Sequence, residues 1–222
     1  MEQSEAFNKL VEGYRRFRQE IYPTQKELFT ELGSQQKPKV LFITCADSRV
    51  DPSLIMQTDP GSLFVCRNIG NVVPAYGEML GGVSAVVEYA VSALDVSDVV
   101  VCGHSDCGAM KALRQKNDAK LDAMPTVKSW LRNAEAALSV AHAKYGDLPA
   151  EEMTHALVKE NVLLQMQHLR THPAVAAGLA KQTVRLHGWV YQISSGCLLT
   201  ADDAGTEWAQ LDAAVTEVAR FR

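Results

Sequence analysis

The sequence predicts an α/β fold with a central, mostly parallel sheet of four strands plus an antiparallel edge strand, flanked by helices and preceded by an N-terminal helical arm. Three observations support this class. Short apolar runs rich in β-branched residues recur along the chain and are typical of buried strands. Between them, apolar residues repeat at helical spacing, as in strand–helix–strand units. The last two strand-like runs are separated only by a short turn, which predicts an antiparallel hairpin.

The chain is long enough for one large domain. Of its 222 residues, 47% are hydrophobic and 22% are charged, as in an ordinary globular protein. No internal repeat or linker divides the sequence. We therefore expect a single domain over residues 1–222, with a helical arm (1–34), an α/β core that carries the functional site (35–200) and a tail (201–222).

Charge and cysteine usage exclude several classes of partner. The net charge of −4 and the lack of a basic stripe argue against nucleic acid. No apolar segment reaches the roughly 20 residues that cross a bilayer, and the polar N-terminus does not resemble a signal peptide. The five cysteines form no disulfide framework in a chain of this length. We therefore expect a cytoplasmic protein that binds neither nucleic acid nor a membrane.

The arm begins with an amphipathic helix. Apolar residues recur at helical spacing over 5–21, and a second helix is expected from Pro23 to Leu32, ending at Gly33. Such a helix at a chain end must dock on its own core or across a subunit interface. The later elements are expected in this order: strand 39–44, short helix 51–59, strand 62–66, turn 67–71, helix 79–94, strand 98–103, a helix from Cys107, helices over 125–145 and 149–171, strand 183–194, strand 197–200, and a weakly patterned tail from Gly205.

Two of the strand-like runs end in residues that bind metals. Cys45 follows the run Lys39–Thr44. The run Asp98–Gly103 is followed by His104 and Cys107. Open α/β sheets place their ligands at the carboxyl ends of strands, so we expect these three side chains to meet there. Two thiolates and one imidazole suit zinc, and three protein ligands leave a fourth tetrahedral position for water, which indicates a catalytic site.

Asp47 and Arg49 lie beside the first cysteine. The Asp47 carboxylate could accept a hydrogen bond from zinc-bound water, or become a fourth ligand that closes the site. Arg49 is the expected partner that holds it away from the metal by a charge-assisted bond. The alternative is a structural ion pair, which the adjacency to the metal disfavours. We interpret the cysteines at 66, 102 and 197 as packing residues, and the histidines at 142, 155, 168, 172 and 187 as surface or core residues.

These motifs resemble those of the β-class carbonic anhydrases, most closely bacterial members, including those that accompany cyanate degradation. The likeness covers about residues 30–200. It implies reversible hydration of carbon dioxide to bicarbonate and a proton by attack of zinc-bound hydroxide. One Zn²⁺ per chain would bind Cys45, His104 and Cys107, with Asp47 and Arg49 as the catalytic dyad. The matching segments are Cys-Ala-Asp-Ser-Arg-Val from Cys45, Pro60-Gly61, Phe64-Val65, Arg67-Asn68, Glu88-Tyr89-Ala90 and Gly-His-Ser-Asp-Cys-Gly from Gly103.

The resemblance also implies a substrate pocket and an oligomer. In the family several pocket residues come from the neighbouring subunit, so a homodimer is the smallest active unit, and we expect it to assemble to a tetramer. Gln36 would donate a hydrogen bond to a substrate oxygen. The pocket residues implied for carbon dioxide are Gln36, Phe64, Ile69, Tyr89 and Gly108.

Two positions depart from the relatives. Plant members carry a proton-transferring His where this chain has Ala93. Many bacterial members carry a Trp that helps to hold an inhibitory bicarbonate, together with an Arg and a Tyr. Here that position is Phe42, and the matching residues are Arg67 and Tyr191. Because Phe lacks an N–H donor, we expect bicarbonate to bind there about ten- to hundredfold more weakly or worse, so that none is bound at physiological concentrations and inhibition is not strongly cooperative.

Three other functions fit parts of the pattern. A related zinc hydrolase of carbon disulfide or carbonyl sulfide would use the same ligands. A non-enzymatic zinc or redox-sensing module would need a fourth ligand, for which Asp47 is available. A zinc deaminase would require His-x-Glu and Cys-x-x-Cys, which this sequence lacks. Hydration of carbon dioxide is therefore the function that we expect.

Overall fold

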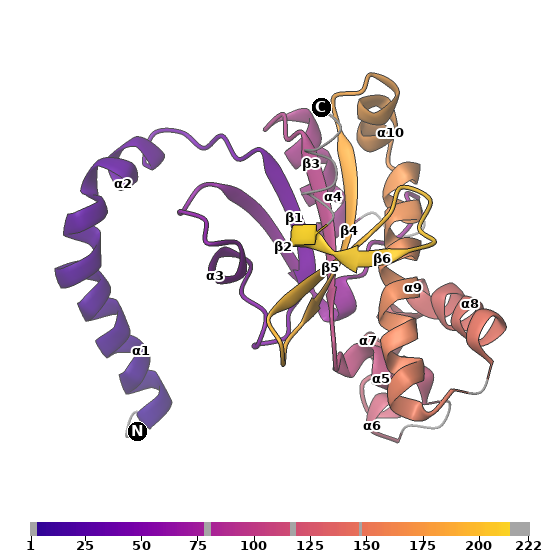
Figure 1. Ribbon diagram of the computed structural model, residues 1–222. Helices are drawn as coiled ribbons and strands as arrows, with labels where there is room; N and C mark the ends of the chain where they lie inside the picture. The colour runs from indigo at the N-terminus through magenta and orange to yellow at the C-terminus, as the bar shows by residue number, and fades with distance from the viewer. Residues whose placement is uncertain (1–3, 78–80, 116–118, 147, 214–222) are drawn as a thin grey trace. The chain divides into compact units, whose positions relative to one another are not determined.

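The chain divides into two units, Met1–Lys37 and Pro38–Arg222. The computed structural model, drawn in Figure 1, describes residues 4–77, 81–115, 119–146 and 148–213. The site-bearing elements all belong to the second unit.

The first unit is a helical arm. Its first helix, α1 (Glu5–Arg16), is capped by Ser4, whose hydroxyl accepts a hydrogen bond from the N–H of Phe7 at 3.3 Å. A π-helical turn continues the chain beyond α1, and a 3-10 turn leads into α2 (Lys26–Leu32). The two expected helices are therefore present, but the second begins later than its proline suggests, because the proline lies in the 3-10 turn.

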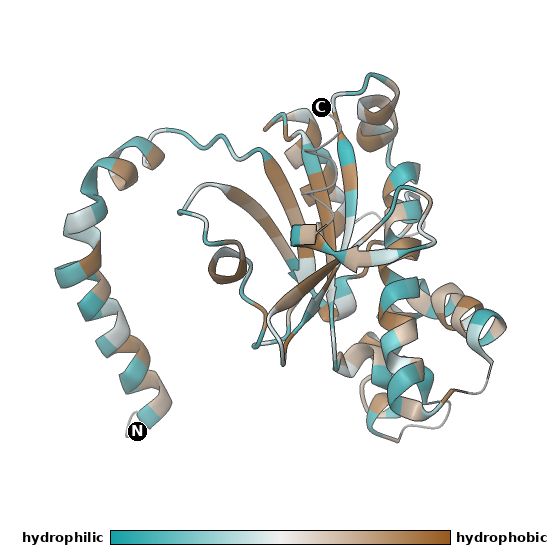
Figure 2. Ribbon diagram, in the orientation of Figure 1, coloured by the Kyte–Doolittle hydropathy of each residue, from teal (hydrophilic) through white to brown (hydrophobic). Residues whose placement is uncertain are grey.

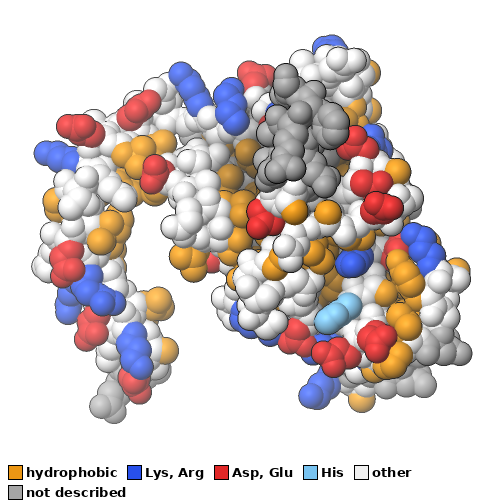
Figure 3. Space-filling view, in the orientation of Figure 1, with side chains coloured by type: hydrophobic (Ala, Val, Ile, Leu, Met, Phe, Trp, Pro, Cys, Tyr) orange, Lys and Arg blue, Asp and Glu red, His pale blue; other side chains and the backbone are white. Residues whose placement is uncertain are grey.

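Large apolar side chains of the arm are exposed. No described residue of α1 is buried, and hydrophobic side chains are visible along the arm in Figure 3. The rings of Phe17, Tyr22 and Phe29 pack on one another between the two helices. The exposed large apolar side chains of the arm are Phe7, Leu10, Tyr14 and Ile21.

The second unit is built on a six-stranded mixed sheet with the order β2–β1–β3–β4–β5–β6. The pairs among β2, β1, β3 and β4 are parallel, and the pairs β4–β5 and β5–β6 are antiparallel. All the expected strands are present. β6 lies in the tail, where the sequence shows no strand pattern, and it replaces β5 at the edge of the sheet. The strands are β1 (Val40–Cys45), β2 (Leu63–Asn68), β3 (Asp98–His104), β4 (Arg185–Gln192), β5 (Cys197–Ala201) and β6 (Trp208–Gln210).

The helices follow most of the expected segments. The helix expected over 125–145 is divided into α7 and α8 by a 3-10 turn at Arg132–Ala134. Sequence analysis missed α6, which has only four residues, and α10, because its run of small and apolar residues has no polar face. Residues 79–80 of the helix expected over 79–94 lie outside the described residues. The helices are α3 (Pro52–Met56), α4 (Gly82–Ser92), α5 (Gly108–Arg114), α6 (Ala119–Asp122), α7 (Pro125–Leu131), α8 (Glu135–Tyr145), α9 (Ala150–Thr171) and α10 (Pro173–Ala180).

Side chains of the central strands alternate between two apolar layers. Ile43 of β1 and Val101 of β3 belong to the main core, which also contains residues of α4 and α9. Phe42 and Val100 belong to a smaller cluster on the other face. Figure 2 shows β1 as hydrophobic along its length, as expected for a strand buried on both faces.

Two glycines let α9 lie directly on the sheet. A Cβ atom at Gly103 of β3 would lie 2.9 Å from Cγ2 of Val162, and one at Gly188 of β4 would lie 2.5 Å from Sδ of Met166. Any larger residue at these positions would have to push the Val162 and Met166 side chains aside. α9 therefore packs behind the end of β3 that carries His104.

Candidate metal centre

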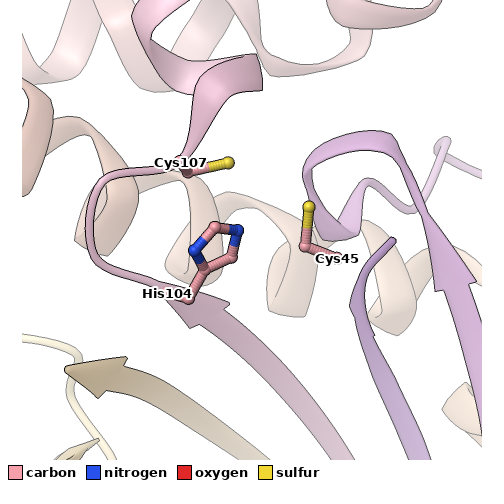
Figure 4. A group of neighbouring side chains, drawn as sticks. All are labelled: Cys45, His104 and Cys107. Atoms are coloured by element: carbon pink, nitrogen blue, oxygen red, sulfur yellow. The ribbon is translucent and has the colours of Figure 1, made fainter. Parts of the chain in front are cut away.

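The three metal-binding side chains predicted from the sequence lie together. Cys45 is the last residue of β1, His104 is the last residue of β3, and Cys107 directly precedes α5. β1 and β3 are parallel neighbours, so their carboxyl ends coincide. One ligand atom from each residue lies within 4.8 Å of the other two. All three side chains are buried, and Figure 4 shows the imidazole and the two sulfurs facing a common point.

The imidazole of His104 is oriented as a metal ligand. Its Nδ1 lies 2.8 Å from the carbonyl oxygen of Ser105, so Nδ1 carries the proton and donates it there. The other nitrogen, Nε2, then presents a lone pair. Nε2 is buried and has no hydrogen-bond partner among the described residues. A metal ion bound between the two sulfurs and Nε2 would satisfy this lone pair, so the residues present fit a metal.

The two cysteines share one proton unequally. The hydrogen bond from the Cys107 thiol, with a smaller contribution from the N–H of Gly70, outweighs burial and lowers the pKa of Cys45 well below its usual range. Gly70 N lies 3.4 Å from the Cys45 sulfur. The pKa of Cys107 is raised, because this thiol keeps its proton beside the Cys45 thiolate and is also buried. A metal ion that binds both sulfurs must displace that remaining proton.

Asp47 lies beside the cluster and is held by Arg49. Nε of Arg49 donates to Oδ1 of Asp47 at 2.9 Å, and Nη2 donates to Oδ2 at 2.8 Å. This bidentate pair lowers the pKa of Asp47 and raises the pKa of Arg49. Oδ2 of Asp47 also lies 3.8 Å from Nε2 of His104. In the part of the chain that is described, Asp47 is outside the group of three close ligand atoms.

Sequence analysis missed two further contacts of this loop. Arg49 also donates from Nη1 to Oδ2 of Asp106 at 2.9 Å. Arg67 donates to the carbonyl oxygens of Cys45 at 3.2 Å and Asp47 at 2.7 Å, and so braces the loop backbone. The sequence signal for Asp106 was its place between the two ligands of the second motif. The contacts of Arg67 depend on the pairing of β1 with β2, which residue type alone does not reveal.

The expected substrate-pocket residues occupy less enclosed positions. The rings of Phe64 in β2 and Tyr89 in α4 are tilted on one another, with centroids 5.9 Å apart. The side chains of Ile69 and Tyr89 are 42% and 50% exposed. Gly108 begins α5 with open space where a Cβ would stand. Gln36 belongs to the first unit, in the exposed segment after α2, so it is not placed relative to this group.

The positions considered for an inhibitory bicarbonate have other contacts. The ring of Phe42 is buried and meets Trp189 edge to face, with centroids 6.0 Å apart. The Tyr191 carbonyl accepts from the N–H of Ser105 at 2.9 Å. The weak binding of bicarbonate there stays a prediction.

Comparisons with known proteins agree with this site. A family model described as carbonic anhydrase matches residues 40–198. A carbonic anhydrase of Pseudomonas aeruginosa is 49% identical over 202 residues, which cover 91% of this chain and 90% of that protein. Carbonic anhydrase 1 of Escherichia coli O157:H7 is 47% identical over 206 residues, covering 92% of each chain.

A solved structure shows the same fold. The β-carbonic anhydrase CcaA superposes with a TM-score of 0.87 at 40% sequence identity, covering 93% of this chain and 100% of that chain. These matches favour hydration of carbon dioxide over the other functions that the ligand set allows. The chain therefore belongs to the carbonic anhydrases, and within them to the β class, which are enzymes that hydrate carbon dioxide reversibly.

Proposed function

We propose that this carbonic anhydrase works with one Zn²⁺ per chain, held by Cys45, His104 and Cys107. The observation that carries the proposal is the buried Nε2 of His104, which lies with two sulfurs inside a 4.8 Å group and has no partner among the described residues. Thiolate and imidazole are the ligands that zinc prefers, and three of them leave a position for water. Zinc would lower the pKa of that water to roughly 7, which supplies a nucleophile near neutral pH.

The role that we propose for Asp47 is to accept a hydrogen bond from the attacking water and orient it. Its Oδ2 lies 3.8 Å from Nε2 of His104, which is close enough to reach a molecule at the metal but outside bonding distance. Arg49 occupies both carboxylate oxygens, so Asp47 stays ionised and stays out of the ligand set. Asp47 could become a fourth ligand only by giving up at least part of this pair.

We propose that Phe64, Ile69 and Tyr89 form the apolar side of the substrate pocket. Carbon dioxide is small and apolar, and a nearly dry pocket would hold it against the nucleophile. Gly108 leaves open space at the start of α5, and Gln36 would donate to a substrate oxygen. Because the side chains of Ile69 and Tyr89 are about half exposed on one chain, a second subunit is needed to enclose the pocket.

A homodimer that assembles to a tetramer is therefore the form that we propose. Large apolar side chains are exposed on both units, and exposed apolar clusters mark interaction surfaces. β2 is an edge strand of the sheet, and its Val65 side chain is 39% exposed. The arm carries its own exposed stripe, which would cover apolar surface of another subunit. In the second unit the exposed side chains include Leu54, Val65, Ile69, Tyr76 and Tyr89.

The cytoplasm is the compartment that we propose. All five cysteines are free thiols, which suits a reducing compartment. Among the described residues, no helix combines the length and the apolar character that a bilayer span requires.

The zinc site is tested by comparing two cysteine variants. Cys45→Ser removes a proposed ligand, whereas Cys66→Ser changes a buried cysteine of the neighbouring β2. We expect the wild type and Cys66→Ser to contain about one zinc per chain and to hydrate carbon dioxide in a stopped-flow assay. Cys45→Ser should lose both metal and activity. Equal zinc content in the two variants would contradict the ligand assignment, and turnover of carbonyl sulfide without carbon dioxide hydration would contradict the proposed reaction.

A further inference from the structure

We propose that Asp106 is a positioning residue for the hydration reaction, which fixes the guanidinium of Arg49 and, through it, the carboxylate of Asp47. The proposal rests on the roles proposed above for Asp47 and Arg49. It extends the pair to a chain of four charged side chains that ends on Lys111 of α5.

The guanidinium of Arg49 is held from two sides. One side donates from Nε and Nη2 to the two oxygens of Asp47. The other donates from Nη1 to Oδ2 of Asp106 at 2.9 Å and from Nη2 to the backbone carbonyl of Asp106 at 3.3 Å. A planar guanidinium that is hydrogen-bonded on two sides is fixed in one orientation. A guanidinium that is hydrogen-bonded on one side only can rotate about that contact.

Asp106 is itself anchored. Its Oδ1 accepts from Nζ of Lys111, one turn into α5. Its backbone has φ of 60°, in the left-handed region that aspartate tolerates better than most residues. The turn that carries Asp106 runs between His104 and Cys107, so Arg49 is tied to the same turn that carries two of the proposed ligands. The contact between Arg49 and Asp106, which are 57 residues apart in the sequence, thereby fixes Asp47 relative to those ligands.

The simpler interpretation is a surface ion pair that contributes nothing to the reaction. The side chains of Arg49, Asp106 and Lys111 are 44%, 52% and 46% exposed, and pairs this exposed contribute little to stability. Catalysis depends on position more steeply than stability does, because a small misplacement of a catalytic group can slow a reaction by up to a hundredfold. Asp106 should therefore affect turnover without affecting folding.

The test is Asp106→Asn, which keeps the size of the side chain and the tolerance for positive φ but removes its charge. We expect kcat for carbon dioxide hydration to fall about three- to tenfold, with KM within twofold and zinc content unchanged. In the background of Arg49→Ala the same change should have no further effect, because Asp106 acts through Arg49. Lys111→Met should also lower kcat, by a smaller factor than Asp106→Asn does.

A spectroscopic measurement separates positioning from a general structural effect. In protein labelled with ¹⁵N-arginine, the Nε–H resonance of Arg49 should shift in Asp106→Asn. Asp122→Asn is the matched control, since it breaks the similarly exposed pair of Asp122 with Lys128 on α6 and α7. The control should leave both kcat and the Arg49 resonance unchanged.

Each other outcome overturns the proposal. It fails if Asp106→Asn keeps the wild-type kcat, loses zinc, or lowers kcat equally with and without Arg49. Asp47→Asn separates this failure from failure of the proposed function. Full turnover by Asp47→Asn would remove the roles proposed for Asp47 and Arg49. If Asp47→Asn loses turnover and Asp106→Asn is fully active, only the role of Asp106 is removed.

Discussion

Main-chain groups contact two of the three proposed ligands. The Ser105 carbonyl fixes the tautomer of His104, and the N–H of Gly70 supports the thiolate of Cys45. These contacts are made by main-chain groups, so substitution of neighbouring side chains leaves them in place.

At this scale Asp47→Asn is the sharpest change. An amide keeps the shape of the carboxylate, but an NH2 group replaces one of its oxygens, so it cannot pair bidentately with Arg49 and accept from the water at the same time. We expect zinc content to be unchanged and kcat to fall about hundredfold or more. Stopped-flow turnover and metal analysis on the same preparation check this. Wild-type turnover would remove Asp47 from the mechanism.

Residue patterns predict the ligands better than they predict the partners of the ligands. Cys45 and His104 each follow an apolar run, and the rule for parallel sheets places both at one edge. Asp106 reaches Arg49 from a turn where its backbone has a positive φ, and residue spacing does not reveal that conformation. Arg67 illustrates the same limit, since its hydrogen bonds to the Cys45 loop require the register of β1 against β2.

At the scale of elements, β3 is held at both ends. Its last residue, His104, belongs to the metal centre, and its first residue, Asp98, is tied to β4. Arg185 donates to both oxygens of Asp98 at 2.9 Å, and His187 lies 2.8 Å from Oδ1. Burial alone would raise the pKa of Asp98, but the bonds from Arg185, Ser97 and His187 outweigh it and lower this pKa to about 2.

This pair predicts a pH-dependent contribution to stability. Because the folded pKa of Asp98 lies below the unfolded value of about 3.9, the ionised pair stabilises the fold above about pH 4, and the contribution is lost as the pH falls toward 2. We expect Asp98→Asn to lower the free energy of unfolding by about 1 kcal/mol between pH 5 and 8, a modest value because the Arg185 side chain is exposed. Denaturant titrations at several pH values measure it.

The difference between wild type and Asp98→Asn should shrink below about pH 4. Asp122→Asn, which breaks only an exposed pair, should show a much smaller difference at every pH. A difference that stays constant down to pH 3 would contradict the assignment to Asp98.

Helices and strands with a clear pattern of apolar residues were predictable from the sequence, and those without such a pattern were not. The runs inside β1 and β3 are apolar and α9 is long, so each was expected. β6 has three residues, too few for an alternation to be recognised. α10 begins directly after α9, and its small residues pack closely without an amphipathic pattern. Gly178 illustrates this, since a Cβ there would lie 2.5 Å from Cγ2 of Val184.

At the scale of the whole molecule, both the arm and the core expose apolar side chains that a second subunit could cover. The arm exposes the apolar stripe of α1, and the core exposes apolar side chains around the proposed pocket. We expect removal of residues 1–21 to weaken the assembly and to lower activity at the same time, because the pocket would lose its cover. Sedimentation combined with activity measurements over a range of concentrations checks this. A fully active monomer would refute a shared active site.

The close packing of α9 on Gly103 restricts the motion of β3. β3 lies inside the sheet, and a helix of 22 residues packs against it without an intervening side chain at this point. Amide hydrogens of such a strand exchange with solvent only when the core opens as a whole. His104 is the last residue of this strand, so it should keep its place until the core of the second unit opens.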